Sequence, residues 1–579
     1  MNKLLKIFNL ITINNLKLGI HYLKNNGIHK FISQFFLYTS SDKSNYNYYI
    51  KKNRLHKSIL DSQSSVRFKN TPFFQIIYPY NNIHIKLLLN TLELQTYKNW
   101  DLFIPCTLKK HIPSKTNLHF FDDFDSLITS GYEYDYIVFF NEYALSSPDL
   151  LFEAASSINE DASDFIYYDE DIISSAKKRS NPYFKSDYNY DMLMQQNYIG
   201  NNFCISRHAV QKIFDITHSS CHKLMNDCAV YANRFCHQIT HISKILIHNL
   251  NKYSLIDSDK YKLSIAGYFT HYNIDACITS NSNDRLRISY KLLANPFISI
   301  IIPNKDHIED LSKCINSIFK STYTNYEIII VENNSTEEKT FHYYQHISQH
   351  AKVKIIKWNK EFNYSAINNF AVTHAAGEFI LFLNNDTEVI CADWLEEMLM
   401  YAQRKDVGIV GSLLLYPDNT VQHAGVILGI QGIAGHSHKN FPAADNGYFN
   451  RLCLVQDYSC VTAACMMIRK TIFQEVNQFD EQFKVAFNDI DLCLKVRQQN
   501  YLIVYTPYAK LYHYESKSRG IENTPEKLSR FQSEINHFRK KWQKLLDEGD
   551  PYYNKNLTLL YEDFSLKRKI EYKNNFSFY

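Results

Sequence analysis

The chain has 579 residues, enough for two to four domains at about 100 to 200 residues each. Apolar residues make up 45% and charged residues 21%, which excludes a disordered protein, and 15 Gly and 13 Pro exclude a collagen-like or linker-dominated chain. With 63 Lys and Arg against 59 Asp and Glu, the net charge is +4, which argues against nucleic acid as a partner.

The first residues do not form a signal peptide, because they lack a long apolar core and a cleavage site of small residues. Residues 16–37 continue with helical apolar spacing and several lysines. Two interpretations stay open: a helix packed on the first domain, or a weak anchor on a membrane surface. No run of about 18 apolar residues occurs, so no transmembrane helix is predicted.

The twelve cysteines contain no C-x-x-C pair and no spacing that suggests a zinc site. Most lie in apolar runs, where a free cysteine acts as a small hydrophobic residue. We therefore expect a reducing compartment. The predicted location is the cytoplasm, with peripheral contact at the inner face of the cytoplasmic membrane if the N-terminal stretch is an anchor.

Two segments of the chain are alike. Each begins with an apolar run between prolines, continues with a helical stretch, and reaches a Tyr-x-Asn-aromatic sequence. Pro72 and Pro296 are 224 residues apart, and Tyr97 and Tyr323 are 226 apart. Two anchors at nearly the same offset indicate a tandem duplication, and the period is too long for a solenoid. The expected boundaries are 1–70 (helical extension), 71–255 (first copy), 256–295 (connector), 296–520 (second copy) and 521–579 (helical extension).

The second copy is the clearer one. Apolar runs predict buried strands at 298–302, 327–331, 353–356 and 379–383, and helical spacing predicts a helix over 308–318. This alternation is typical of an α/β fold with a mostly parallel sheet, whose ligands bind at the carboxyl ends of the strands. The polar residues that come after these runs are Asn304, the segment from Glu332 to Ser335, and the segment from Asn384 to Glu388.

A long amphipathic helix is predicted over 525–545. Thr524 is placed to cap it, and Pro525 is at the first helical position. We expect its apolar face to pack on the second domain or between the two domains. That face consists of Leu528, Phe531, Ile535, Phe538, Trp542 and Leu545.

Two carboxylate motifs have both a chemical and a structural interpretation. Asp386 in Asn384-Asn385-Asp386 suits a divalent cation that binds phosphate oxygens, but the tripeptide is also good turn chemistry. Asp489 and Asp491 are two residues apart and do not share a helix face. One can act as a general base, or both can simply favour a helix N-terminus.

Histidines and cations complete the set of candidates. His513 is either a metal ligand or a core histidine, and Lys517 and Arg519 can neutralise a diphosphate. His423, His436 and His438 lack an identifiable third zinc ligand, so we expect them to be loop residues that touch an acceptor.

Taken in chain order, these motifs resemble glycosyltransferase family 2, the inverting GT-A transferases, and within it the rhamnosyltransferase-like branch of bacterial cell-surface polysaccharide synthesis. The resemblance covers residues 296–520. The matching segments are 297–303, 328–335, 362–369, 377–388, 393–396, 487–494 and 508–515. The implied fold is two tandem GT-A domains with helical extensions at both ends.

The resemblance implies a role for each matching residue. Asn384 and Asn385 depart from the acidic pattern of the D-x-D position, so Asp386 is left as the metal carboxylate, with His513, for Mg²⁺ or Mn²⁺. Asp489 is the implied general base. The implied donor-binding residues are Pro303, Asn304, Glu332, Asn333, Asn385, Asp386, Lys517 and Arg519.

The implied reaction is a direct displacement with inversion. Asp489 takes the proton of an acceptor hydroxyl, whose oxygen attacks the anomeric carbon of a UDP- or dTDP-linked sugar. The acceptor is a glycan or a lipid-linked glycan of an O-antigen, capsule or rhamnan type. Two alternatives remain: a non-catalytic carbohydrate- or nucleotide-sugar-binding component of an assembly complex, and a sugar-nucleotide pyrophosphorylase. The second is disfavoured because residues 303–306 are not a glycine-rich phosphate loop.

The first copy resembles the family more weakly, over residues 72–250. The repeat places Cys106 at the position of Glu332, Tyr143 at that of Asp386 and His248 at that of His513, while Asn226-Asp227 keeps the base-like pair. We expect a degenerate domain that serves as a scaffold or binds the acceptor. The alternative is that Glu142 or Asp169 substitutes for the missing carboxylate.

Overall fold

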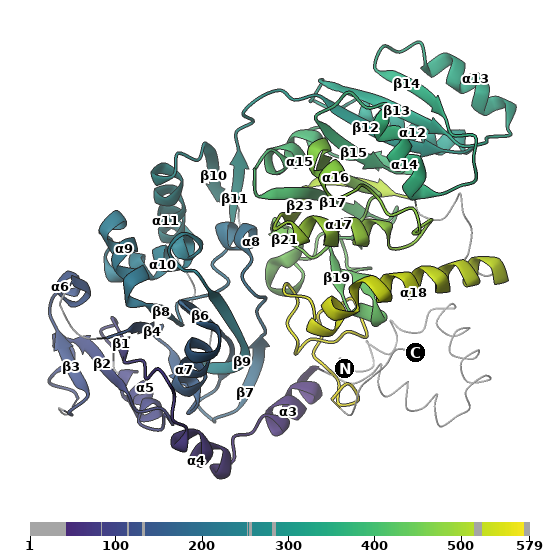
Figure 1. Cartoon of the computed structure of the whole chain (residues 1–579). Helices are drawn as coiled ribbons and strands as arrows, with labels where there is room; N and C mark the ends of the chain where they lie inside the picture. The colour runs from purple at the N-terminus through teal and green to yellow at the C-terminus, as the bar shows by residue number, and fades with distance from the viewer. Residues whose placement is uncertain are drawn as a thin grey trace.

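A computed structural model of the protein describes residues 42–82, 84–112, 115–129, 134–251, 253, 258–280, 285–514 and 524–572. Two α/β regions make up the molecule (Figure 1). We call residues 74–250 the N-terminal region and residues 298–513 the C-terminal region. The predicted stretch 16–37 lies outside the described residues. None of the described helices is both long enough and apolar enough to span a bilayer.

The N-terminal region is preceded by α3 (Asp42–Lys52) and α4 (Lys57–Ser65). Its own elements are β1 (Phe74–Ile77), α5 (Ile85–Leu92), β2 (Trp100–Pro105), the 3-10 helix η1 (Cys106–Leu108), β3 (Leu118–Phe121), α6 (Phe124–Thr129), β4 (Tyr136–Phe139), β5 (Ala144–Ser146), α7 (Leu150–Asp161), β6 (Phe165–Ile173), β7 (Arg179–Tyr183), α8 (Tyr190–Gln195), β8 (Phe203–Ser206), α9 (Arg207–Thr217), α10 (Cys221–Phe235) and β9 (Ile239–Leu250). Then α11 (Ser258–His271) and the hairpin β10 (Ala276–Ser280) and β11 (Leu286–Tyr290) lead onward.

The elements of the C-terminal region are β12 (Ile298–Asn304), α12 (Ile308–Ile318), β13 (Tyr326–Glu332), α13 (Glu338–Ile347), β14 (Val353–Lys357), α14 (Tyr364–Thr373), β15 (Phe379–Leu383), β16 (Thr387–Val389), α15 (Trp394–Ala402), β17 (Val407–Leu415), β18 (Val421–His423), β19 (Val426–Leu428), η2 (Ile430–Gly432), β20 (Ala434–His436), η3 (Tyr448–Cys453), β21 (Gln456–Asp457), β22 (Cys465–Arg469), α16 (Lys470–Glu475), α17 (Asn488–Gln498) and β23 (Leu502–His513). The long helix α18 (Pro525–Glu548) comes next.

The two main sheets have the same strand order. It is β3-β2-β1-β4-β8-β6-β9-β5 in the first and β14-β13-β12-β15-β22-β17-β23-β16 in the second. The directions also correspond: the pairs among the first four strands are parallel, β8 and β22 run antiparallel to both neighbours, and β6–β9 and β17–β23 are parallel. A duplication would produce this correspondence.

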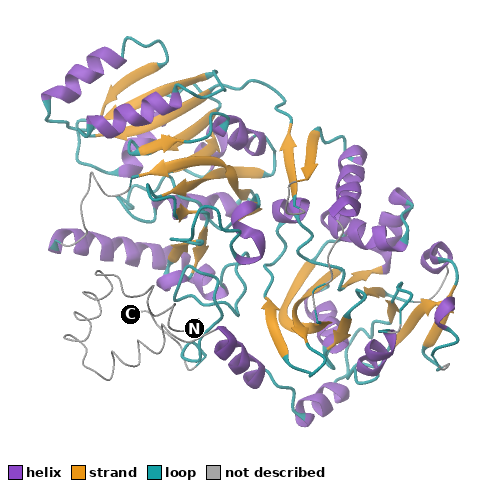
Figure 2. Cartoon of the chain, turned by 180° about the vertical axis from the view of Figure 1, so that it is seen from behind, coloured by secondary structure: helices purple, strands orange, loops and turns teal. Residues whose placement is uncertain are grey.

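Each sheet is buried on both faces (Figure 2). In β12, Ile298, Ile300 and Ile302 belong to the core under α12, α13 and α15, whereas Ile301 belongs to the core under α14, α16 and α17. Because successive side chains of a strand point to opposite faces, a strand covered on both sides needs a continuous apolar run. The runs that predicted the strands and the helix 308–318 therefore correspond to β12, β13, β14, β15 and α12.

Helix α18 begins as predicted. Thr524 accepts a hydrogen bond from the Lys527 amide, and Pro525 occupies the first turn. Ile535, Phe538 and Trp542 are buried against the C-terminal region, but Leu528 is 52% exposed. Beyond Glu548 the chain continues through turns, and this segment contacts the N-terminal region: the Asp187 amide donates to the Pro551 carbonyl oxygen at 2.9 Å.

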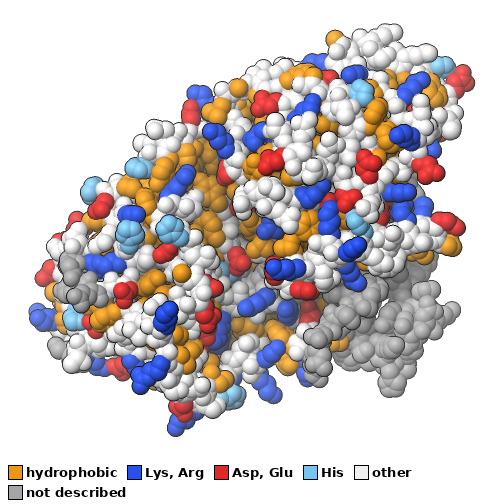
Figure 3. Space-filling model, in the orientation of Figure 1, with side chains coloured by type: hydrophobic (Ala, Val, Ile, Leu, Met, Phe, Trp, Pro, Cys, Tyr) orange, Lys and Arg blue, Asp and Glu red, His pale blue; other side chains and the backbone are white. Residues whose placement is uncertain are grey.

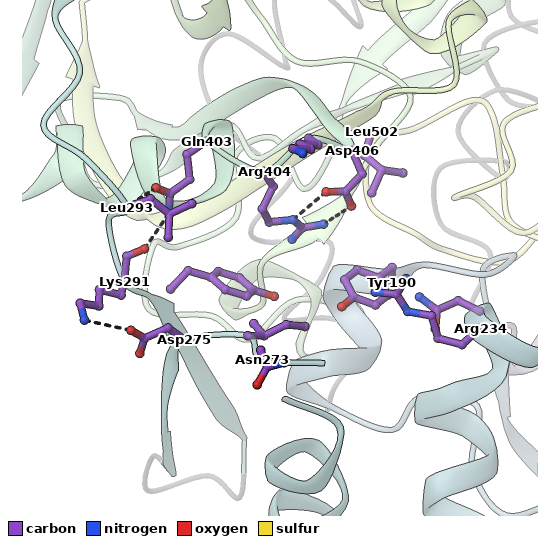
Figure 4. Close-up of a pocket in the computed structure, with 14 residues that line it drawn as sticks. Tyr190, Arg234, Asn273, Asp275, Lys291, Leu293, Gln403, Arg404, Asp406 and Leu502 are labelled. Carbon is purple, nitrogen blue, oxygen red and sulfur yellow. Dashed lines mark hydrogen bonds and ion pairs between the residues drawn. The ribbon is translucent and has the colours of Figure 1, made fainter. Parts of the chain in front are cut away.

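The two regions meet through a buried polar contact. Arg404 Nη1 lies 2.5 Å from Asp191 Oδ1, and Asn189 Nδ2 donates to the Asp457 carbonyl oxygen at 2.8 Å. Burial, and then the Asp191 carboxylate, raise the pKa of Asp457 well above its usual value. A cavity of about 680 Å³ lies beside this contact, and none of the predicted site residues lines it (Figure 4).

Candidate active site

Three strand ends bring the predicted residues to one edge of the second sheet. Asn304 is the last residue of β12, Glu332 is the last of β13, and Asn384 comes directly after β15. Asn385 Nδ2 donates to Asn304 Oδ1 at 2.6 Å, and Asn304 Nδ2 donates to the Tyr344 hydroxyl at 2.8 Å. Pro303 is half-buried in β12, opposite Val331. Hydrogen bonds of amide side chains therefore hold the loops at this edge in position.

Glu332 is 5% exposed and uses only one of its carboxylate oxygens within the described residues. Its Oε1 accepts from the Ser335 amide at 2.6 Å, while its buried Oε2 has no partner there. Asn333, beside it, donates to the carbonyl oxygens of Trp358 and Lys360. A buried carboxylate oxygen without a donor costs free energy, so this position is suited to a ligand that supplies an N–H or O–H group.

Asp386 and His513 lie side by side because β16 and β23 pair antiparallel, with Thr387 opposite His513. The His513 Nε2 to Asp386 Oδ1 distance is 3.2 Å, and both side chains are nearly buried. His513 Nδ1 lies 2.6 Å from Gln422 Oε1. An amide oxygen only accepts, so this contact assigns the proton to Nδ1 and leaves the Nε2 lone pair to accept from Asn384 Nδ2 at 3.2 Å.

A carboxylate oxygen and a neutral imidazole nitrogen are suitable ligands for Mn²⁺ and, less well, for Mg²⁺. The described residues contain no group of three or more His, Cys, Asp and Glu side chains that could hold a metal. A cation here would therefore have two protein ligands and would complete its shell with water and phosphate oxygens. That donor set fits a cation that binds together with a nucleotide diphosphate.

Asp489 lies in the first turn of α17. Its Oδ2 accepts from the Ala463 amide at 3.2 Å and its Oδ1 from the Ile490 amide at 2.9 Å. Burial raises the pKa of Asp489, although hydrogen bonds from the Thr462 side chain and these amides act in the opposite direction. The side chain remains half-buried and not fully enclosed. A carboxylate with a raised pKa that solvent can still reach is a suitable general base.

Residues 462–464 connect Asp489 to Asp386 and His513. The Asn384 amide donates to the Ala464 carbonyl oxygen at 3.0 Å, and the Thr462 amide donates to His423 Nε2 at 3.5 Å. His423 comes directly after Gln422, the partner of His513. Gln422 and Thr462 were not among the predicted site residues: neither stands in a recognisable motif, and the Gln422-His423 sequence drew attention only to its histidine.

The histidines of this segment behave differently from the prediction. His423 Nδ1 lies 2.9 Å from His436 Nδ1, and burial, with His436 and His513 nearby, lowers the pKa of His423 well below its usual value. His438 was expected to touch an acceptor, but it is fully buried and accepts from the Tyr448 amide at 3.0 Å. Burial, followed by the Arg451 charge, lowers the pKa of His438 to about 3. His438 is therefore a neutral structural histidine.

Asp491 and Asp489 lie in different surroundings on α17, as the helix geometry predicts. It is fully buried and binds α18: Trp542 Nε1 donates to it at 2.9 Å, and Lys541 Nζ lies 2.6 Å away. Of the two carboxylates, only Asp489 lies beside residues 462–464. Lys517 and Arg519 lie outside the described residues.

The N-terminal region has different chemistry at the corresponding edge. Cys106 stands at the end of β2, as Glu332 stands at the end of β13, and Tyr143 precedes β5 as Asp386 precedes β16. The prediction that His248 corresponds to His513 is wrong by one residue. Ala144 pairs with Asn249, as Thr387 pairs with His513, so Asn249 occupies the corresponding position. His248 instead lies 2.5 Å from Asp171.

The C-terminal region is similar to known proteins. Residues 299–476 match the family model described as Glycosyl transferase family 2. An uncharacterized protein, y4gI, of Sinorhizobium fredii is 35% identical over 86% of this chain and 59% of its own length. The O-antigen biosynthesis protein RfbC of Myxococcus xanthus is 32% identical over 76% of this chain and 35% of its own length. The chain thus spans about three fifths and one third of these relatives.

Among solved structures, a mannosyltransferase of Pyrobaculum calidifontis in complex with GDP-Man and Mn²⁺ aligns with a TM-score of 0.33 at 15% identity. The alignment covers 43% of this chain and 65% of that chain.

Proposed function

We propose, from the match of residues 299–476 to the family model described as Glycosyl transferase family 2, that the protein transfers a sugar from a nucleotide sugar to a glycan hydroxyl. The transfer inverts the anomeric configuration and serves the synthesis of a cell-surface polysaccharide of O-antigen, capsule or rhamnan type. The observation that carries the proposal is the meeting of Asp386 with His513 at 3.2 Å on the sheet edge that also holds Asp489.

In the proposed reaction, Asp489 takes the proton of the acceptor hydroxyl. The freed oxygen attacks the anomeric carbon from the face opposite the diphosphate, so a single displacement inverts the centre. Of the two carboxylates at the start of α17, Asp489 is the one available for this step, because Asp491 is held by Trp542 and Lys541. That arrangement favours direct displacement over a covalent sugar–enzyme intermediate.

The remaining residues bind the donor. Glu332, whose buried Oε2 has no partner among the residues that the structure describes, is placed to accept a hydrogen bond from the nucleotide. Asn304, Asn333 and Asn385 hold the surrounding loops. Asp386 and His513 would hold Mg²⁺ or Mn²⁺, which supplies positive charge to the leaving diphosphate. Lys517 and Arg519 keep their predicted role at the same diphosphate.

The proposed donor is a UDP- or dTDP-linked sugar, and the proposed acceptor is a glycan or a lipid-linked glycan. We propose that the protein works in the cytoplasm, in peripheral contact with the inner face of the membrane where such an acceptor is lipid-linked. On the face shown in Figure 3, basic and acidic side chains are interspersed, in keeping with the net charge of +4 and with a partner other than nucleic acid.

The test is nucleotide release from a panel of UDP- and dTDP-sugars by the full chain, with and without Mn²⁺ or Mg²⁺. We expect metal-dependent release that is lost in Asp386→Ala and Asp489→Asn. Glu309→Ala is the matched control, because Glu309 is an exposed carboxylate of α12 paired with Lys339. Tight donor binding without turnover, even when acceptors are added, would reject the transferase and support a binding component.

A further inference from the structure

A second polar pocket, of about 350 Å³, lies in the N-terminal region where it meets the C-terminal region. Asn141, shortly after β4, and Asn202, which precedes β8, line it. In the shared strand order these positions correspond to those after β15 and at the start of β22. The pocket therefore occupies, in the N-terminal region, the place that the candidate active site occupies in the C-terminal region.

Charge in this pocket is balanced within the protein. Lys185 Nζ lies 2.5 Å from Glu170 Oε1, and both side chains are buried. Glu170 Oε2 also accepts from Asn249 Nδ2 at 2.6 Å, while Lys185 donates to the Ile199 carbonyl oxygen. The cation is thus neutralised, and Tyr143 stands at the position of the metal carboxylate. The pocket is unsuited to a diphosphate, which needs uncompensated positive charge.

Amide groups supply the hydrogen-bonding capacity of the pocket. Asn201 Oδ1 is buried and has no hydrogen-bond partner within the described part of the chain. Gln196 and Asn450 bridge the two regions at the rim, with Asn450 Nδ2 donating to Gln196 Oε1 at 2.8 Å. Amides both donate and accept, as sugar hydroxyls do, so they are well matched to a polyhydroxylated neutral ligand.

Aromatic rings form another wall. Tyr183 stacks on Phe449 with ring centroids 3.7 Å apart, and Tyr253 contacts both rings edge-on. Phe449 and Asn450 have φ values of 46° and 73°, in the left-handed region. For a phenylalanine this conformation is strained, and such strain concentrates at ligand-binding positions. The loop from the C-terminal region thus holds an aromatic ring against a pocket of the N-terminal region.

We propose that this pocket binds a neutral saccharide without reacting with it, and that the saccharide is part of the acceptor glycan. The acceptor role rests on the proposed function, but the saccharide-binding role does not. Amide groups would bind the hydroxyls, and the rings would cover the apolar face of the sugar. The N-terminal region would then hold the growing glycan while the C-terminal region extends it.

The test measures binding of the full chain to an array of immobilised bacterial surface oligosaccharides, without nucleotide sugar or metal. We expect binding to one class of glycan, weakened at least tenfold in Phe449→Ala and severalfold in Asn201→Ala. Asn201→Ala removes an amide whose oxygen has no partner among the described residues, and it serves as the second variant if Phe449→Ala does not fold. Phe341→Ala, which truncates an exposed ring of α13, is the matched control and should bind as the unmodified chain does.

Equal binding by the unmodified chain, Phe449→Ala and Asn201→Ala would overturn the proposal, and so would absence of binding to every glycan. Nucleotide release from donor sugars is measured separately. If the pocket variants lose glycan binding while no donor is hydrolysed by any form of the protein, the saccharide site stands and the proposed transferase activity fails.

Discussion

The two regions share the order and direction of their strands but differ in the residues beyond the strand ends. After β15 and before β16 the C-terminal region has Asn384, Asn385 and Asp386, whereas the equivalent turn of the N-terminal region has Asn141, Glu142 and Tyr143. The scaffold is set by apolar runs within the strands, and the chemistry is set by a few residues in the turns. Either can change without the other, so two regions of one fold can differ in their chemistry.

The carboxylates at the equivalent positions of the two regions, Asp489 and Asp227, also differ in their hydrogen-bond partners. Asp489 accepts from backbone amides and the Thr462 side chain, whereas Asp227 is fully buried and paired with Lys223 at 3.0 Å and Ser219 at 2.5 Å. The lone pairs of Asp227 are therefore taken up by an ammonium group and a hydroxyl, which leaves this carboxylate less available to accept a proton from an acceptor hydroxyl. Sequence position alone does not distinguish the two residues.

The largest expected effect tests this difference. Asp489→Asn should lower kcat by about 10²–10⁴-fold, the usual contribution of a general base, while Asp227→Asn should leave it within about threefold. Single-turnover transfer from the donor that the panel selects would measure both variants. Comparable losses in the two variants would show that the N-terminal region also catalyses transfer.

The next effect concerns the contact that joins the regions. Arg404→Met leaves the buried Asp191 without its cation, and we expect it to lower the free energy of unfolding by about 3–5 kcal/mol. Urea denaturation would measure this change. Lys291→Met, which removes the exposed ion pair with Asp275 in the same cavity, is the control and should cost about 1 kcal/mol or less (Figure 4). Similar losses would mean that the buried contact does not hold the regions together.

A smaller effect is the pH dependence of transfer. Because burial raises the pKa of Asp489, the base becomes protonated at a higher pH than an ordinary carboxyl, and kcat/KM should fall up to tenfold per pH unit below that pKa. The effect of this pKa on the free energy of unfolding has the opposite sign. Because the folded state binds the proton of Asp489 more tightly than the unfolded state does, this group favours folding more at low pH than at high pH. A pH profile with circular dichroism at each point separates the two. An acid loss that coincides with unfolding would contradict the assignment.

The smallest effect is confined to the C-terminal region. Burial acts to raise the pKa of Asp480, but hydrogen bonds from His537, the Gln482 amide and Lys541 lower this pKa to about 2. The charged Asp480 carboxylate therefore stabilises the folded state above the usual carboxyl pKa, and this stabilisation is lost as the pH falls from about 4 to about 2. Asp480→Asn should therefore reduce the stability of α18 docking by about 1 kcal/mol at pH 7, a value limited by solvent screening. Thermal denaturation at pH 7 and pH 3 should show a smaller difference at pH 3.

Much of this arrangement could be predicted from the sequence. Strands covered on both faces require continuous apolar runs, so β12 to β15 were predictable, and residues after parallel strands must share an edge. The partners of Asp489 and His513 were not predictable, because Thr462 comes from the turn before β22 and Gln422 from the short strand β18. The assignment of His248 failed because His248 and Asn249 are adjacent polar residues of β9, and only the register decides which one faces the edge.

The segment after α18 completes part of the N-terminal region late in synthesis. Asn554 donates to both carboxylate oxygens of buried Asp169 and to the carbonyl oxygen of Lys185, which lies 369 residues earlier. At about 5–20 residues per second, a ribosome needs roughly 20 to 70 seconds to make that intervening chain. During this interval the N-terminal region lacks one of the donors to Asp169. The hydrogen bonds around Asp169 and Lys185 are therefore completed only by a segment that is synthesised after the C-terminal region has emerged.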